Sequence, residues 1–535
     1  MILIYCCPSS LLTLVKVPVY FINLETIQSM HSELNRQSGI LLHLTSLPGP
    51  HGIGDLGLGA NSFVDSMKEM GQRLLQILPA NPPESLYHCP YSASSAFAGN
   101  SLLISLEALQ KDGFLEDGDL ADFPQSTKDR VEFDKVNPAR MALLQKAADR
   151  FPKKALTDML AEFNDFCIKN QNWLDHYAMY CHLAEKYNHV NWTQWSAPLR
   201  SCDLKAIQVE FAQHQQEINR TKILQYFFYH QWQNLKEYAG SQGVRIIGDI
   251  PNYVAHNSAD VWANQDLFKL DEAGHMIGQS GCPPDFFVKT GQIWGHPIYD
   301  WPKHEKTGFK WWVERIGHLY EMVDMVRIDH FNGFVKYWEV PAMDKNGLNG
   351  FWMQAPGEKL LDTLIKELGT QPILAENLGE AAPDAEPLLK KFGIPGMKVL
   401  QMSFGNGDNP AEMDSSNVVY TGTHDNDTTV GWFHTGAGQA NRQTKNGIDR
   451  ERKQVLDILG SDGSEIHWDM IKLALDSPAD IAIIPLQDIL GLDSRARMNT
   501  PGTVGQNWVW RFDPDLLTPD LKERLLNLTT AAGRS

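Results

Sequence analysis

Cysteine is scarce in this chain of 535 residues. The seven cysteines include an adjacent pair, Cys6 and Cys7, and the others are scattered. This pattern matches neither the ligand spacing of a zinc site nor the even set of a disulfide framework. It therefore excludes a disulfide-stapled scaffold and favours a reducing compartment, which we take to be the cytoplasm.

Positive charge and long apolar runs are also lacking. Lys and Arg number 47 against 65 Asp and Glu, which gives a net charge of -18. Nucleic acid and anionic membrane surfaces would be repelled by such a chain, so we expect neither as a partner. No apolar stretch is long enough to cross a bilayer. A neutral or cationic ligand suits these numbers better.

Nucleotide and metal motifs are absent or incomplete. Residues 52–57 match the Gly-rich dinucleotide pattern, but Pro48 and Pro50 lengthen the turn that this pattern requires, and the next apolar run ends at Pro79 without a ribose-binding acid. Residues 425–427 lack the further ligands of a calcium loop. The sequence thus predicts no cofactor and no metal.

Short apolar runs recur along the chain, and most are separated by helical patterns. Eight stand out, at residues 40–44, 73–78, 244–249, 324–331, 372–375, 397–402, 418–421 and 480–486. Continuously apolar strands that alternate with helices indicate a parallel sheet. Eight of them predict an α/β fold, a (β/α)8 TIM barrel.

The surplus length of the chain predicts insertions within one barrel domain at 38–535. Residues 101–240 are mainly amphipathic helix, and residues 281–301 form a loop rich in Gly, Pro and aromatics. Residues 1–37 are expected to be an extension or a mis-assigned start, with Met30 as an alternative initiator. Residues 516–526 have a helical pattern, so no C-terminal β-sandwich is expected.

The fourth apolar run, residues 324–331, contains two charged residues near its end. Alternation along a strand places Arg327 and Asp329 on one face, about 7 Å apart along the backbone, so the guanidinium can reach the carboxylate and hold it ionised. A structural ion pair is the simpler interpretation of these two residues alone. The other runs change that balance.

Acidic residues follow several of the runs. Because parallel barrel strands end at one mouth, Asp249, Asp329, Glu376 and Asp425 are expected to converge. Any one of them taken alone could instead cap a helix. Two convergent acids suit glycoside chemistry, with Asp329 as nucleophile and Glu376, among apolar neighbours, as the proton donor. Asp425 would then bind sugar hydroxyls.

With these strand ends in hand, the chain resembles the 4-alpha-glucanotransferases (amylomaltases, disproportionating enzymes) of glycoside hydrolase family 77. The resemblance runs from about Ser38 to Phe512, through the segments 39–49, 94–100, 281–299, 327–331, 375–379, 423–426 and 497–502. Departures from the family pattern at Cys89, Ser101 and Asn332 concern the sugar subsites.

This resemblance implies a retaining double displacement by Asp329, Glu376 and Asp425 on malto-oligosaccharides, glucose and linear alpha-glucans. It further implies substrate contacts from Tyr91, Asp249, Gln292, Trp294, Arg327, His424 and Asn499. A hydrolase that uses the same acids and an idle glucan-binding protein remain the alternatives. Transfer requires a dry site. The aromatics Phe286, Phe287, Trp294, Tyr299 and Trp301 offer flat faces that either bind sugar rings or pack the loop itself.

Overall fold

A sheet of eight parallel strands forms the centre of the molecule. The computed structural model describes residues 36–84, 88–284, 288–379, 381–404, 413–435 and 445–535. The strands are β1 (Gln37–Leu41), β2 (Leu74–Gln76), β3 (Arg245–Ile250), β6 (Met325–Ile328), β9 (Ile373–Ala375), β10 (Met397–Val399), β11 (Val418–Tyr420) and β12 (Ile481–Pro485). Each overlaps one of the predicted runs. The predicted extension falls mostly on residues outside the described ones.

The sheet closes on itself into the expected barrel. Its strand order is β10-β11-β12-β1-β2-β3-β6-β9, so β10 and β9 are the two ends. A parallel bridge joins Ala375 at the end of β9 to Gly396 just before β10. The Ala375 N–H also donates to the Pro395 carbonyl at 2.9 Å. Closure leaves no free edge and brings the carboxyl ends of the strands to one mouth.

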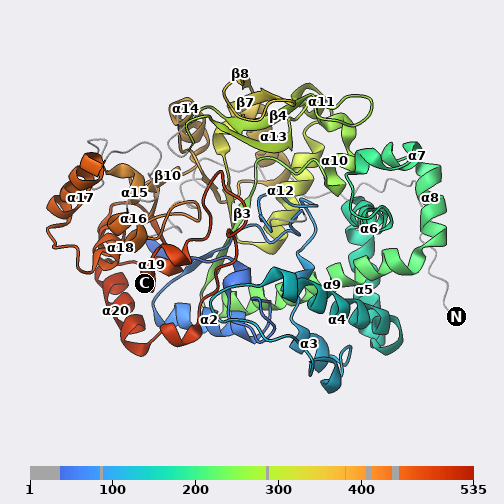
Figure 1. Ribbon diagram of the computed structural model, residues 1–535, viewed down its shortest axis with the longest axis horizontal. Helices are drawn as coiled ribbons and strands as arrows, with labels where there is room; N and C mark the ends of the chain where they lie inside the picture. The colour runs from blue at the N-terminus through green and yellow to red at the C-terminus, as the bar shows by residue number, and fades with distance from the viewer. Residues whose placement is uncertain (1–35, 85–87, 285–287, 380, 405–412, 436–444) are drawn as a thin grey trace.

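Helices surround the barrel. Figure 1 places β3 near the centre of the view, α16 to α20 at the left and α3 to α9 at the right. The helices outside the segment between β2 and β3 are α2 (Leu58–Glu69), α10 (Ala259–Ala263), α11 (Trp301–Lys306), α12 (Lys310–Met322), α13 (Gly357–Leu368), α14 (Ala382–Phe392), α15 (Leu400–Ser403), α16 (Thr429–Thr435), α17 (Lys445–Leu459), α18 (Ile466–Asp476), α19 (Leu486–Ile489) and α20 (Pro519–Ala531).

The segment between β2 and β3 is helical, as its amphipathic patterns predict. It contains α3 (Leu106–Lys111), α4 (Phe133–Lys154), α5 (Thr157–Lys169), α6 (Gln171–Lys186), α7 (Ala197–Arg200), α8 (Leu204–Gln213) and α9 (Gln215–Ser241). Helix α9 joins it to the barrel, since its Phe228, Trp232 and Leu235 are buried in the main core. The domain boundaries drawn from the sequence stay a prediction.

A second sheet corrects one expectation. Residues 281–301 were expected to be a loop, yet β4 (Gly278–Cys282) and β5 (Gln292–Pro297) pair there in an antiparallel sheet with β7 (Lys336–Pro341) and β8 (Phe351–Gln354). Burial along β5 alternates, and Gly281 sits so close to the Gln292 carbonyl that a Cβ would lie 2.2 Å from its oxygen. The glycines of this segment suggested a loop, since glycine is rare inside strands. The strands that pair with β4 and β5 could not be recognised, because β7 and β8 lie farther along the chain.

The end of the chain is helical, as expected. Helix α20 begins at Pro519, and the described residues 486–535 contain no β-sandwich. In the parts of the chain that the structure describes, no helix combines the length and the apolar character needed to cross a bilayer. Helix α12, which leads into β6, has its Trp311 and Trp312 buried as core residues.

Candidate active site

Three of the four predicted acids, Asp249, Asp329 and Glu376, lie together at the mouth of the barrel because β3, β6 and β9 are neighbours. Asp249 in β3 is in register with Arg327 in β6, and Ile328 in β6 is in register with Ala375 in β9. Asp329 directly follows Ile328, and Glu376 directly follows Ala375. Adjacent strands are about 4.8 Å apart, so the two carboxyl groups start from neighbouring backbone positions.

Arg327 connects two of these acids. Its Nη1 lies 2.7 Å from both oxygens of Asp249 and 3.1 Å from Oδ1 of Asp329. The contact with Asp329 confirms the strand argument. The sequence did not indicate that Asp249, whose side chain is fully buried, would be the nearer partner. Asp249 therefore fixes the guanidinium, and its own oxygens are occupied by protein groups.

Glu376 is held by the backbone that follows Asp329. The His330 N–H donates to Oε2 of Glu376 at 2.6 Å, and the Phe331 N–H donates to the Glu376 carbonyl at 2.9 Å. His330 adopts φ +48°, in the left-handed region that non-glycine residues avoid. A strained backbone conformation of this kind persists only where the surrounding structure holds it in place. Here it aims an N–H at the neighbouring carboxylate.

Both of these carboxyl groups hold their protons more tightly than exposed acids do. Burial raises the pKa of Asp329 well above its ordinary value, and Glu376, Asp249 and Asp425 add to this rise while Arg327 opposes it. Burial likewise raises the pKa of Glu376, against Arg327 and the His330 N–H. Desolvation thus opposes the charge on Asp329 that Arg327 favours, and the ionised state expected from the sequence stays a prediction.

Asp425 lies on the opposite side of the mouth, after β11. Its Oδ1 accepts a hydrogen bond from Asn499 Nδ2 at 2.6 Å and lies 3.4 Å from His424 Nε2. Arg497 Nη2 donates to the Asp425 carbonyl at 2.6 Å, and Arg497 Nε donates to the Asn499 carbonyl at 2.7 Å. Arg497 was part of a sequence motif but had no assigned role. It holds both loops together.

Tyr91 bridges the two sides. Its hydroxyl donates to Oδ2 of Asp249 at 2.7 Å, and its ring stacks on His424 with centroids 4.7 Å apart. Trp508 packs against both rings, with centroids 5.8 Å from each. Nothing in the sequence singled out Trp508. Its position, 84 residues after His424 in the chain, gave no local signal.

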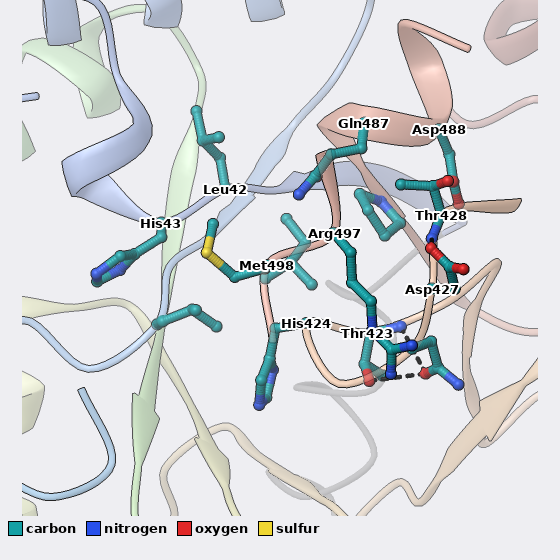
Figure 2. Close-up of a pocket in the computed structure, with 14 residues that line it drawn as sticks. Leu42, His43, Thr423, His424, Asp427, Thr428, Gln487, Asp488, Arg497 and Met498 are labelled. Atoms are coloured by element: carbon teal, nitrogen blue, oxygen red, sulfur yellow. Dashed lines mark hydrogen bonds between the residues drawn. The ribbon is translucent and has the colours of Figure 1, made fainter. Parts of the chain in front are cut away.

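A pocket opens beside this stack. Figure 2 shows His43, His424, Arg497 and Met498 around it, with Thr423 below and Gln487 and Asp488 above. Asp488 accepts hydrogen bonds from Thr421 and Thr429 and so ties the ends of β11 and β12 together. Asp488, which follows β12, has a structural role, since its oxygens are bound by the protein.

The small sheet supplies Gln292 and Trp294. Trp294 Nε1 donates to Oε1 of Gln292 at 3.3 Å, and its ring meets that of His330 edge to face with centroids 4.8 Å apart. Trp294 is half-buried. Tyr299 and Trp301 are 1% and 5% exposed, so of the two expected alternatives they pack in the core and do not face the sugar. Phe286 and Phe287 lie outside the described residues.

All seven predicted substrate residues therefore lie around the three predicted catalytic acids, on the elements just described. Asp249 and Arg327 are almost wholly buried, each 3% exposed, whereas Tyr91, Trp294 and Asn499 are partly exposed. The roles of these residues stay predictions. The arrangement can protonate a leaving group on one side and present a carboxylate on the neighbouring strand.

Comparisons with known proteins agree with this arrangement. A family model described as 4-alpha-glucanotransferase matches residues 42–518. The 4-alpha-glucanotransferase of Synechocystis sp. is 42% identical over 507 residues, which cover 93% of this chain and 98% of that protein. The Thermus thermophilus 4-alpha-glucanotransferase is 40% identical over 508 residues, covering 94% of this chain and all of that one.

Solved structures give the same result. Amylomaltase from Streptococcus agalactiae, in complex with acarbose, superposes with a TM-score of 0.87 at 34% identity and covers 94% of this chain and 100% of its own. Amylomaltase from Corynebacterium glutamicum has a TM-score of 0.78 at 18% identity, over 95% of this chain and 76% of its own. The second likeness concerns the fold alone.

Proposed function

The chain belongs to the 4-alpha-glucanotransferase family, and from this membership and the geometry of the mouth we propose how Asp329, Glu376 and Asp425 share the reaction. The enzyme transfers alpha-glucan segments. In our proposal, a segment moves from a malto-oligosaccharide donor to the 4-hydroxyl of glucose or of another glucan. Retention of configuration follows from two successive displacements.

The observation that carries the proposal is that the peptide group between Asp329 and His330 donates a hydrogen bond to Glu376. The His330 N–H that follows Asp329 binds the Glu376 carboxylate at 2.6 Å. Retaining glycosidases need their two carboxyl groups about 5 Å apart. Asp329 and Glu376 follow paired residues of two adjacent parallel strands, and this placement supports such a spacing.

In the first displacement, Glu376 gives its proton to the glycosidic oxygen while Asp329 attacks the anomeric carbon. The bond to the leaving sugar breaks, and an ester bond forms between Asp329 and the remaining segment. Burial raises the pKa of Glu376, which favours the protonated form that this step needs. Arg327 contacts Asp329 at 3.1 Å, so we assign the negative charge of the pair to Asp329 and the proton to Glu376.

In the second displacement, Glu376 acts as base. It removes a proton from the incoming 4-hydroxyl, whose oxygen attacks the anomeric carbon and releases Asp329. Asp425, held by Asn499, accepts hydrogen bonds from hydroxyls of the reacting sugar and favours its flattened, positively charged transition state. Trp294 beside His330 covers the site against water.

The proposed substrates are linear alpha-glucans, malto-oligosaccharides and glucose. These sugars are uncharged, so the net charge of -18 does not repel them. The S. agalactiae relative binds acarbose, which supports an oligosaccharide-sized site. The proposed location is the cytoplasm. The described cysteines 89, 167, 181, 202 and 282 form no disulfide, which fits a reducing compartment. Cell fractionation with an antibody would check the location.

Incubation of the purified protein with maltotriose tests the proposal. Transfer predicts glucose together with a ladder of maltopentaose and longer oligomers, because each donor leaves a segment that another sugar accepts. A hydrolase would yield only sugars shorter than maltotriose, and an idle binder would yield no product. Added glucose should redirect the segments toward short acceptors in a transferase and leave the rate of a hydrolase unchanged.

A further inference from the structure

Away from the barrel mouth, two helices turn metal-ligating side chains toward one another. His182 lies on α6, while Glu210 lies on α8 and His214 caps its end. Their ligand atoms all lie within 4.8 Å of one another. Figure 1 shows α6 and α8 on the right of the view, within the helical segment between β2 and β3.

The two histidines lie farther from Glu210 than in a typical hydrogen bond, although the contact with His182 still counts as a long one. His182 Nε2 lies 3.4 Å and His214 Nε2 3.8 Å from the same atom, Oε2 of Glu210. Hydrogen bonds between nitrogen and oxygen are commonly 2.7–3.2 Å long. Ligands about 2.0–2.1 Å from a tetrahedral zinc ion are instead separated by about 3.3–3.4 Å. The separation of His182 from Glu210 matches that of two zinc ligands, and the separation of His214 from Glu210 is somewhat longer.

Glu210 has one carboxylate oxygen placed to coordinate such an ion. Its other oxygen, Oε1, accepts a hydrogen bond from Lys186 Nζ at 2.6 Å. Lys186 is one turn beyond His182 on α6, and His214 is one turn beyond Glu210, so each helix contributes an i, i+4 pair. A hydrogen bond of this kind orients a ligating carboxylate. Oε2 is left facing both imidazoles.

Burial points to the same cluster. Within α8, all of which the structure describes, Glu210 is the one buried residue, at 8% exposure, while Leu204 and Val209 are 75% and 54% exposed. The apolar residues of α8 that pack against the core, Ala206, Ile207 and Phe211, are only partly buried. His182 is also 8% exposed, whereas the His214 side chain is 34% exposed. An ion would enter past His214.

We propose that His182, Glu210 and His214 bind a divalent transition-metal ion of the zinc type that fastens α8 to α6. Two imidazoles and one carboxylate are a known donor set for zinc, with a fourth position for water. No pattern in the sequence indicated this site, because the Glu210–His214 pair is local but His182 precedes Glu210 by 28 residues. The simpler reading is an ion pair of Glu210 with Lys186.

Zinc titration of the chelator-treated full chain separates these two readings. The proposal expects one high-affinity zinc ion per chain by calorimetry and a melting temperature that rises with zinc concentration. His182→Gln and His214→Gln should each weaken binding by at least about a hundredfold, since losing even an outer partner of a ligand costs 10- to 100-fold. His176→Gln, on an exposed position of α6, is the matched control and should bind as wild type does.

Cobalt substitution of the wild-type chain gives a reading that needs no variant. Bound Co²⁺ in a tetrahedral site with nitrogen and oxygen ligands absorbs visible light far more strongly than the octahedral aqua ion. Such a band, displaced by zinc, supports the site. Its absence, or zinc affinities that are equal in wild type, His182→Gln and His214→Gln, would leave only the ion pair with Lys186 and overturn the proposal.

Discussion

Arg327 lies closer to Asp249 than to Asp329, at 2.7 Å against 3.1 Å. The guanidinium is thus anchored by a carboxylate that is not the proposed nucleophile. Arg327 and Asp249 are both almost wholly buried, so each one neutralises a charge that water cannot reach. Asp249 positions the arginine, and the arginine in turn positions Asp329.

Asp249→Asn should destabilise the protein by about 3–5 kcal/mol, because it leaves a buried guanidinium without its main counter-ion. Denaturant unfolding measures this loss. Tyr91→Phe is the control: it removes one hydrogen bond to Asp249 and keeps the ion pair, so a loss of about 1 kcal/mol is expected. Equal losses in the two variants would contradict the anchoring role.

Asp329→Asn should lower the rate of transfer from maltotriose on the order of a thousandfold or more, because an amide cannot form the covalent intermediate. Product ladders resolved by chromatography measure the rate. Circular dichroism should show an unchanged fold. A variant as active as wild type would refute Asp329 as the nucleophile.

Asp329→Asn should also raise the melting temperature at neutral pH. Burial raises the pKa of Asp329 in the folded chain, so between its unfolded and folded values the folded state binds more protons. Stability from this group is present below the unfolded pKa and is lost as pH rises through the folded pKa. The asparagine variant lacks this loss, so its stability should fall less from acid to neutral pH. Calorimetric scans across that range check the slope.

Arg497→Lys should reduce kcat by up to about a hundredfold with a smaller change in KM. Lysine cannot bind the carbonyl oxygens of Asp425 and Asn499 together, so the Asp425 loop shifts relative to the sugar. Asn499→Ala should act on the same loop. The double variant is therefore expected to lose less than the product of the two single losses. Full additivity would show that the residues act separately.

Trp294→Ala should increase hydrolysis relative to transfer severalfold, because water gains access beside His330. The ratio of reducing ends released to oligomers formed measures this change. Trp352→Ala, on β8 of the same sheet, is the matched control, since Trp352 packs against Trp338. A similar ratio in both variants would mean that Trp294 does not exclude water.

The sequence by itself determined the barrel. Continuous apolar runs such as 481–485 can be buried only on both faces of a parallel sheet, so their number and spacing fix the architecture. The same reasoning placed Asp329, Glu376 and Asp425 at one mouth, because parallel strands share a direction. Alternation along β6 was enough to predict the contact between Arg327 and Asp329.

Only the tertiary structure decided which partners these residues take. Asp249 holds Arg327, Trp508 packs on Tyr91 and His424, and Tyr299 is buried in the core, each through contacts between distant segments. The second sheet was hidden for the same reason, since a strand's hydrogen bonds go to residues far away in the chain. Burial also opposes the expected ionisation of Asp329, because desolvation depends on everything that surrounds a group.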